Sequence, residues 1–154
     1  MYTGGVGGGM LTGVVQWTEG MALRAETGSG FSLKFDAAPD HGGTEQGPRP
    51  KEITLLSLGG CTAMDVLSIL RKMQVPFTDF GISLEADSAS QHPAVFTTVR
   101  LTYHTKGEGV ERAKVDRAIT LSLQRYCGVA NMINKTAQLV VLSEINGQEM
   151  PVEV

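Results

Sequence analysis

One apolar stretch, residues 50–70, constrains this chain more than any other feature. It opens with Pro50, which suits the first position of a helix because the N–H that proline lacks would be unpaired there. Arg71 and Lys72 follow it, and cations are favoured at a helix C-terminus. Between residues 53 and 70 the only charged side chain is Asp65. A helix this apolar on all sides has no face that favours water, so we expect a long helix buried in the interior.

The sequence Gly59-Gly60-Cys61 lies in the middle of this expected helix. Each glycine inside a helix costs about 1 kcal/mol relative to alanine. We therefore expect either the close approach of another backbone or a bend that exposes the cysteine. A buried helix that carries one thiol beside two destabilising glycines indicates chemistry at Cys61.

Composition favours a single globular domain. The chain has 154 residues, of which 42% are hydrophobic and 19% charged, and this length is enough to bury a core. Residues 1–9 contain five of the 19 glycines and have no periodic pattern. We interpret them as a flexible leader before one domain, residues 10–154.

The net charge and the search for a targeting segment limit the partners and the cellular location that we expect. The net charge of -3 gives no basic surface for nucleic acid. No basic segment followed by an apolar run and a cleavage site opens the chain, so we expect a cytoplasmic protein. The apolar stretch is nearly long enough to span a bilayer. Its polar residues dilute its hydrophobicity and Asp65 would be costly in mid-membrane, so we expect no membrane partner.

Alternation and helical spacing predict an α+β fold. The order of the patterns is β-β-β, α, β-β, α, β, which predicts antiparallel sheet with the helices gathered on one side. The expected strands cover residues 14–26 (as a pair), 31–35, 82–86, 95–104 and 138–145, and the expected helices cover residues 50–72 and 110–133.

Two of these elements have clear faces. In the strand 95–104, alternation places Val95, Val99, Leu101 and Tyr103 on the inward face. In the second helix most charged residues lie outward, and the helical spacing continues through the second cysteine to residue 133. Tyr126 is expected in the core.

The chain has two cysteines, Cys61 and Cys127. Two cysteines in an intracellular chain argue against a disulfide scaffold, and free cysteine is often an inert core residue. Each of these, however, lies next to a glycine in a helical segment, where a gap could admit a small substrate. If the helices pack together, one thiolate could attack an oxidant to become a sulfenic acid, and the other could condense with it to a disulfide. This chemistry needs a cation or hydrogen-bond donors near Cys61.

Two motifs resemble those of a known family. Residues 58–66, Leu-Gly-Gly-Cys-Thr-Ala-Met-Asp-Val, follow Pro-Lys-Glu at residues 50–52 and resemble the signature of the OsmC/Ohr family of osmotically inducible and organic-hydroperoxide-resistance proteins. Residues 121–129, Leu-Ser-Leu-Gln-Arg-Tyr-Cys-Gly-Val, resemble the family's second cysteine motif. Residues 15–20 resemble the first strand of an OsmC-like subgroup. The resemblance runs from about residue 14 to residue 145.

The resemblance implies an OsmC-like fold, in which an intertwined homodimer holds two thiol sites at the subunit interface. It implies that Cys61 attacks the peroxide and that Cys127 resolves the sulfenic acid. Better-known members also use a glutamate and an arginine beside the first thiol. The usual glutamate position is Lys51 here, and Glu52 is one residue further on.

The other polar residues around the first thiol depart further from the family pattern. The family's arginine has no match by motif, and Arg24 and Arg49 are the candidate substitutes. Asp65 follows Cys61 by four residues on the same helical face, where it either orients a donor in the site or forms a structural hydrogen bond. The three histidines fit no metal-ligand spacing, so we expect no metal, and the resemblance implies no organic cofactor.

These observations support two hypotheses. In the first, the chain is a thiol-dependent peroxidase that reduces organic hydroperoxides through Cys61 and Cys127 in oxidative-stress defence, with an external dithiol as the reductant. In the second, it is a non-catalytic OsmC-like dimer that binds a small molecule or a lipid. The pair of cysteine motifs favours the first hypothesis, and the missing arginine favours the second.

Overall fold

The computed structural model describes residues 9–154. Residues 1–8 of the expected leader lie outside the described residues. The chain divides into two compact units, one ending at Ile53 and one running from Thr54 to Val154. The expectation of a single domain over residues 10–154 stays a prediction.

The first unit contains a three-stranded antiparallel sheet. Its strands are β1 (Gly13–Glu19), β2 (Ala22–Thr27) and β3 (Ser32–Phe35), in the order β1-β2-β3. This sheet is the N-terminal meander that the alternation predicts. The loop after β3 includes the short helix η1 (Pro39–His41) and is held by the carboxylate of Asp36. Hydrogen bonds from the backbone N–H groups of Gln46 and Thr44 lower the pKa of Asp36 to about 2.

Helix α1 (Pro50–Lys72) begins at the proline and ends at the basic pair, as predicted. Its start is closed by Glu52, whose Oε2 accepts a hydrogen bond from the backbone N–H of Arg49 at 2.8 Å. This is the return half of a capping box, in which a residue of the first turn reaches back to the N-cap. Glu52 therefore stabilises the beginning of the helix that carries Cys61.

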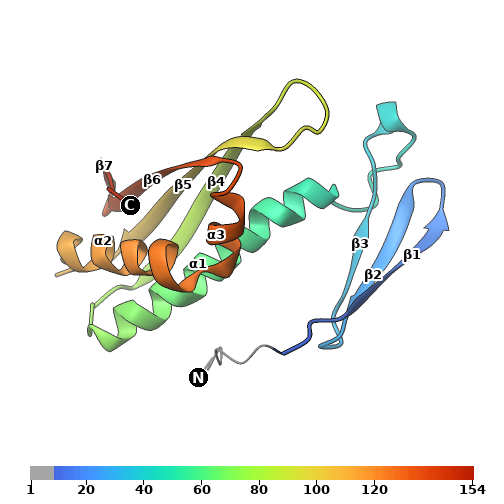
Figure 1. Ribbon diagram of the computed structural model, residues 1–154. Helices are drawn as coiled ribbons and strands as arrows, with labels where there is room; N and C mark the ends of the chain where they lie inside the picture. Colours follow the sequence, from blue (N-terminus) through green and yellow to red (C-terminus); the bar gives the residue numbers. More distant parts are fainter. Residues whose placement is uncertain (1–8) are drawn as a thin grey trace. The chain divides into compact units, whose positions relative to one another are not determined.

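The second unit is a four-stranded sheet with helices on one face (Figure 1). The strands β4 (Asp79–Ser88), β5 (Phe96–Lys106), β6 (Gln138–Ile145) and β7 (Gln148–Pro151) lie in this order. The α+β class is confirmed. Three of the four strands follow the prediction, and β7 is additional. The β5–β6 pair is parallel, whereas its neighbours are antiparallel, because the helices between β5 and β6 return the chain to the same end of the sheet.

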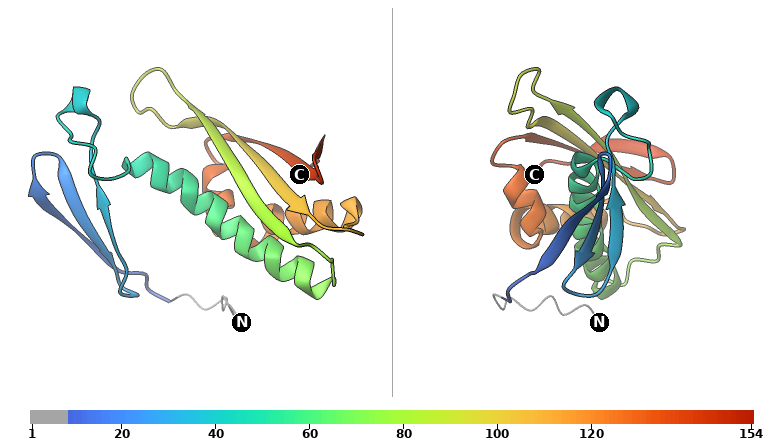
Figure 2. Two further views of the ribbon diagram at one scale, coloured as in Figure 1. Left: turned by 180° about the vertical axis from the view of Figure 1, so that it is seen from behind. Right: turned by 90° about the vertical axis from the view of Figure 1, so that its right-hand side faces the viewer.

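The core of this unit lies between the sheet and the helices. The left view of Figure 2, taken from behind, shows β4 and β5 running alongside α1. Fully buried side chains from α1, β5 and α2 form its centre: Leu58, Val66, Leu70, Val99, Leu101, Tyr103, Val115, Ala118 and Ile119. A Cβ at Gly59 would lie 2.5 Å from Cδ1 of Leu84 on β4. Gly59 thus permits the close approach that the sequence predicts, with a side chain rather than a backbone as the neighbour.

In one chain, α1 buries a single stripe of residues. Its buried positions follow helical spacing from Leu58 to Leu70, whereas Leu56 and Met64 are 58% and 56% exposed. Among the described residues α1 is also the helix that is long and apolar enough to cross a membrane, by length and composition alone. It packs on the sheet through its buried stripe, and Asp65 in its middle accepts a hydrogen bond from Ser122. In one chain the expectation of a helix buried on all sides is not met, because the other faces of α1 stay exposed.

The second predicted helix is interrupted at the cysteine. It consists of α2 (Arg112–Leu121), a π-helical turn η2 (Ser122–Tyr126) and α3 (Gly128–Ile133). Cys127 between them is extended, with φ −74° and ψ 100°, so the prediction of continuous helix is wrong at this residue. The wide turn also leaves Tyr126 58% exposed, which corrects its expected place in the core.

One predicted inward position near the start of strand β5 is also wrong. Val99, Leu101 and Tyr103 are fully buried, as the alternation predicts. A bulge at the start of the strand pairs Ser88 with Phe96. The extra residue reverses the alternation there, so Phe96 packs on the core and Val95 is 43% exposed.

Candidate active site

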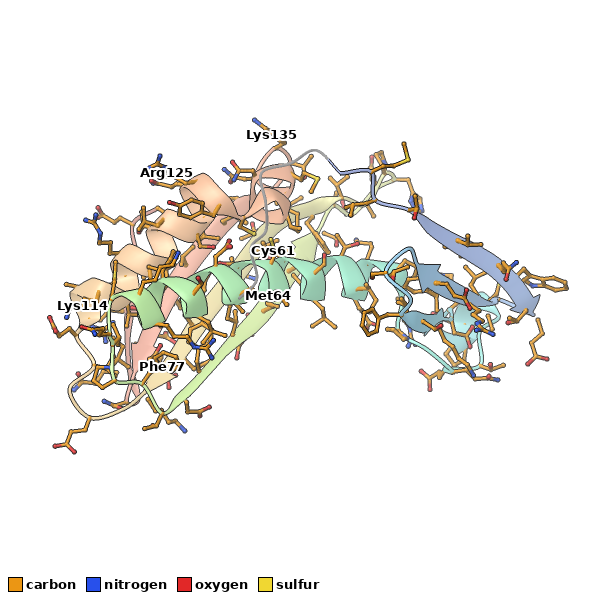
Figure 3. All side chains as sticks on the ribbon, turned by 90° about the horizontal axis from the view of Figure 1, so that it is seen from below. Cys61, Met64, Phe77, Lys114, Arg125 and Lys135 are labelled. Atoms are coloured by element: carbon orange, nitrogen blue, oxygen red, sulfur yellow. The ribbon has the colours of Figure 1, made fainter. Side chains whose placement is uncertain are left out.

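The structure brings Cys61, Asp65 and Cys127 together. Cys61 and Asp65 come from successive turns of α1, and Cys127 comes from the junction of η2 and α3. The two sulfurs and a carboxylate oxygen of Asp65 all lie within 4.8 Å of one another. Figure 3 shows Cys61 on the side of α1 that faces the C-terminal helical segments. The expectation that packed helices would bring the sulfurs close is confirmed.

The π-helical turn places Cys127 at this point. Its backbone N–H bonds to the carbonyl of Ser122, five residues earlier, at 2.8 Å. Its Sγ then accepts a hydrogen bond from the N–H of Ala130 at 3.3 Å and so caps α3. A π-helical turn within helical structure is rare and is frequent at functional sites.

The two thiols differ in their access to solvent. Cys127 is fully buried, whereas Cys61 is partly exposed. A Cβ at Gly60 would meet no described atom within 4 Å, and the same holds at Gly128. The glycines beside both cysteines therefore leave open space, as the sequence suggests, and a small molecule can reach Cys61 first.

Burial also sets the electrostatics of the site. Desolvation is the main cause that raises the pKa of Cys127 to about 12, and the hydrogen bond with the Cys61 thiol is the second. The hydrogen bond from the N–H of Ala130 acts in the opposite direction. Desolvation raises the pKa of Asp65 above its usual value of 3.8. Within the part of the chain that the structure describes, no lysine or arginine contributes to either shift. Burial thus disfavours the charged forms of Cys127 and Asp65, and for Asp65 the hydrogen bond from Ser122 opposes this effect.

A buried chain of hydroxyl groups ends at Asp65. The Oγ of Ser122 donates to Oδ2 of Asp65 at 3.0 Å. Since this uses the single proton of Ser122, Thr62 must donate to Ser122 at 2.8 Å, and Tyr103 must donate to Thr62 at 2.7 Å. Burial raises the pKa of Tyr103, which keeps this first donor protonated. These hydrogen-bonded hydroxyl groups fix the carboxylate of Asp65 beside the two sulfurs.

Breaking this chain at Thr62 should destabilise the protein. The change Thr62→Val removes a hydroxyl group that serves two buried partners, so we expect a loss of about 1–3 kcal/mol in the free energy of unfolding. Thr105→Val is the matched control, because the Oγ1 of Thr105 is also buried but has no hydrogen-bond partner among the described residues. We expect that control to be neutral or stabilising. Urea unfolding with an unchanged m-value would measure the stability of both variants. Equal losses of stability would contradict the proposed chain of hydroxyl hydrogen bonds.

The other predicted site residues, Arg24, Arg49 and Glu52, belong to the first unit. Arg24 pairs with Glu26, and Arg49 pairs with Glu45 at 3.0 Å. Their roles, and a site role for Glu52 beyond its cap, stay predictions. Sequence reasoning missed the hydroxyl chain, although polar residues within apolar helical runs were a signal for it.

Comparisons with known proteins show the family of this chain. The family model described as OsmC-like protein matches residues 42–141. The chain belongs to the OsmC-like family. Protein YhfA of Escherichia coli strain K12 is 32% identical over 131 residues, which cover 85% of this chain and 95% of that protein.

Several solved structures share the fold of this chain. A hypothetical protein from Aquifex aeolicus VF5 has a TM-score of 0.79 at 24% identity, covering 90% of this chain and 97% of that one. An organic hydroperoxide resistance protein OsmC from Legionella pneumophila has a TM-score of 0.67 at 14% identity, covering 88% and 96%. At these identities the likeness concerns the fold, and the chemistry of this chain is argued from its own residues.

Proposed function

We propose that this OsmC-like protein is a thiol-dependent peroxidase that reduces organic hydroperoxides in the cytoplasm as part of oxidative-stress defence. The observation that carries the proposal is the pair of sulfurs within 4.8 Å, one partly exposed and one buried. This is the arrangement that a sulfenic acid needs for rapid capture by a second thiol. The name of the Legionella relative points to the same substrate class.

The reaction follows from the access to the two thiols. The thiolate of Cys61 attacks the terminal oxygen of the hydroperoxide, the O–O bond breaks, and the alkoxide leaves as the alcohol after taking up a proton. Cys61 is then a sulfenic acid. The sulfur of Cys127 attacks the Cys61 sulfur, its proton leaves with the hydroxyl group as water, and a disulfide forms. An external dithiol returns both cysteines to the reduced state by thiol–disulfide exchange.

Burial assigns the two roles in this scheme. A thiol that is fully buried and mostly protonated, as Cys127 is, makes a poor first nucleophile for a dissolved peroxide. It is well placed to attack a neighbouring sulfur. Activation of Cys61 needs a cation or hydrogen-bond donors. We assign this role to Arg24 or Arg49, with Glu52 as the glutamate that orients the arginine. The homodimer proposed below is the assembly in which such residues would complete the site.

A specific observation also supports the second hypothesis, binding of a small molecule or a lipid. The first unit contains an apolar pocket of about 400 Å³ lined mainly by nonpolar side chains, among them Leu23 and Phe35, and also by Arg49, which pairs with Glu45 at 3.0 Å. Such a pocket can take the apolar part of a ligand, and the guanidinium can take a carboxylate. This binding would require no thiol chemistry.

Treatment with cumene hydroperoxide separates the two functions. The reduced wild-type protein should lose both titratable thiols, become lighter by two hydrogen atoms and release one equivalent of the alcohol. Peptide mapping should find a disulfide between Cys61 and Cys127. Thiols that stay fully titratable in excess hydroperoxide would contradict the peroxidase and leave ligand binding as the function.

A further inference from the structure

We propose that the reduced protein binds a zinc ion through Cys61, Asp65 and Cys127. Thiolates and carboxylates are common zinc ligands, and sulfur ligands favour zinc over magnesium or calcium. The three side chains supply one ligand atom each from two structural elements, α1 and the η2–α3 junction. The histidine spacings predicted no metal, and two cysteines that are 66 residues apart form no metal-ligand motif in the sequence.

The spacing of the atoms suits a tetrahedral ion. Zinc binds sulfur at about 2.3 Å and carboxylate oxygen at about 2.0–2.2 Å, so two sulfur ligands lie about 3.8 Å apart. The three atoms here lie within 4.8 Å of one another, and closing the site therefore needs shifts of about 1 Å or less. Side-chain rotation of the partly exposed Cys61 is sufficient for such a shift.

The surroundings of the cluster favour a cation. Among the described residues, each lysine or arginine that forms an ion pair does so with a carboxylate other than that of Asp65. A zinc ion would offset two of the three negative charges that two thiolates and one carboxylate bring to the site. Ser122 holds one oxygen of Asp65 and leaves the other available, which is the usual second-shell support of a metal-bound carboxylate.

Binding has a defined proton balance. Each cysteine gives up its thiol proton when its sulfur coordinates the ion, so close to two protons should be released per zinc. Three protein ligands leave the fourth position to water, which reaches the site beside Cys61 and Gly60. Zinc binding itself involves no oxidation, whereas a Cys61–Cys127 disulfide would remove both sulfur ligands, so only the reduced protein should bind the ion.

Isothermal titration of the fully reduced protein with zinc chloride, in buffers of different ionisation enthalpy, tests the proposal. We expect one ion per chain and release of about two protons. Cobalt(II) should give a thiolate-to-metal charge-transfer absorption. Cys61→Ser and Cys127→Ser should each weaken binding more than 100-fold, and Asp65→Asn should weaken it about 10–100-fold.

The control variant is Asp116→Asn. Asp116 also accepts a hydrogen bond from a serine, Ser143, at 2.6 Å, but it lies outside the thiol cluster, so its variant should bind zinc like wild type. Circular dichroism would confirm that each variant is folded. Equal zinc affinity in the variant that lacks both cysteines, or no binding at micromolar zinc, would overturn the proposal. Zinc binding without hydroperoxide reduction, or the reverse, would separate this site from the proposed function.

Discussion

Replacing Cys61 by serine should abolish hydroperoxide reduction. Serine keeps the size of the side chain, and its position on α1 is only partly buried, so the fold should persist. The variant lacks the sulfur that peroxide reaches, and Cys127 is fully buried. We therefore expect turnover to fall to the background rate of free thiols, measured as alcohol formed from cumene hydroperoxide with excess dithiol.

Replacing Cys127 by serine should stop the same reaction one step later. Cys61 should still consume one equivalent of hydroperoxide, and the sulfenic acid should persist long enough to be trapped by a dimedone-type reagent. No intramolecular disulfide can form. A Cys127→Ser protein that turns over at the wild-type rate with the same dithiol would show that the buried thiol is not the resolving group.

The fold was largely predictable from local patterns. Alternation located most of the strands from β1 to β5, and an unbroken apolar run located β6. The proline and the basic pair marked both ends of α1. The class follows from the order of these elements. The parallel β5–β6 pair was not predictable, because it depends on the path of the chain through α2, η2 and α3. Val95 was placed on the wrong face because a bulge has no reliable signature in residue alternation.

The candidate site was predictable in part. The two glycine-flanked cysteines identified its centre, and helical spacing placed Asp65 on the face of Cys61. The break at Cys127 was not predictable, since a π-helical turn differs from an α-helical one by a single hydrogen-bond shift. The hydroxyl chain through Thr62, Ser122 and Tyr103 joins three elements, so no spacing in the sequence reports it.

The exposed face of α1 leads to the second large prediction, a homodimer. A helix with almost no charge between its ends leaves Leu56 and Met64 more than half exposed in one chain. Soluble monomers rarely expose large contiguous apolar surfaces, and a twofold symmetric contact is the commonest way to bury one. An obligate interface of this kind should bury roughly 2,000 Å² or more. Light scattering at micromolar concentration should report about twice the chain mass of 16.4 kDa.

A charge on this face should break the dimer. Met64→Arg would place a guanidinium from each subunit in the buried contact, and an unpaired buried charge costs several kcal/mol. We expect the dissociation constant to rise on the order of a hundredfold or more, since each 1.4 kcal/mol is a factor of ten. Val95→Arg is the matched control, because Val95 is an exposed apolar residue outside α1. A wild-type chain that stays folded and monomeric at micromolar concentration would refute the dimer, and with it the assembly in which Arg24 or Arg49 is expected to reach Cys61.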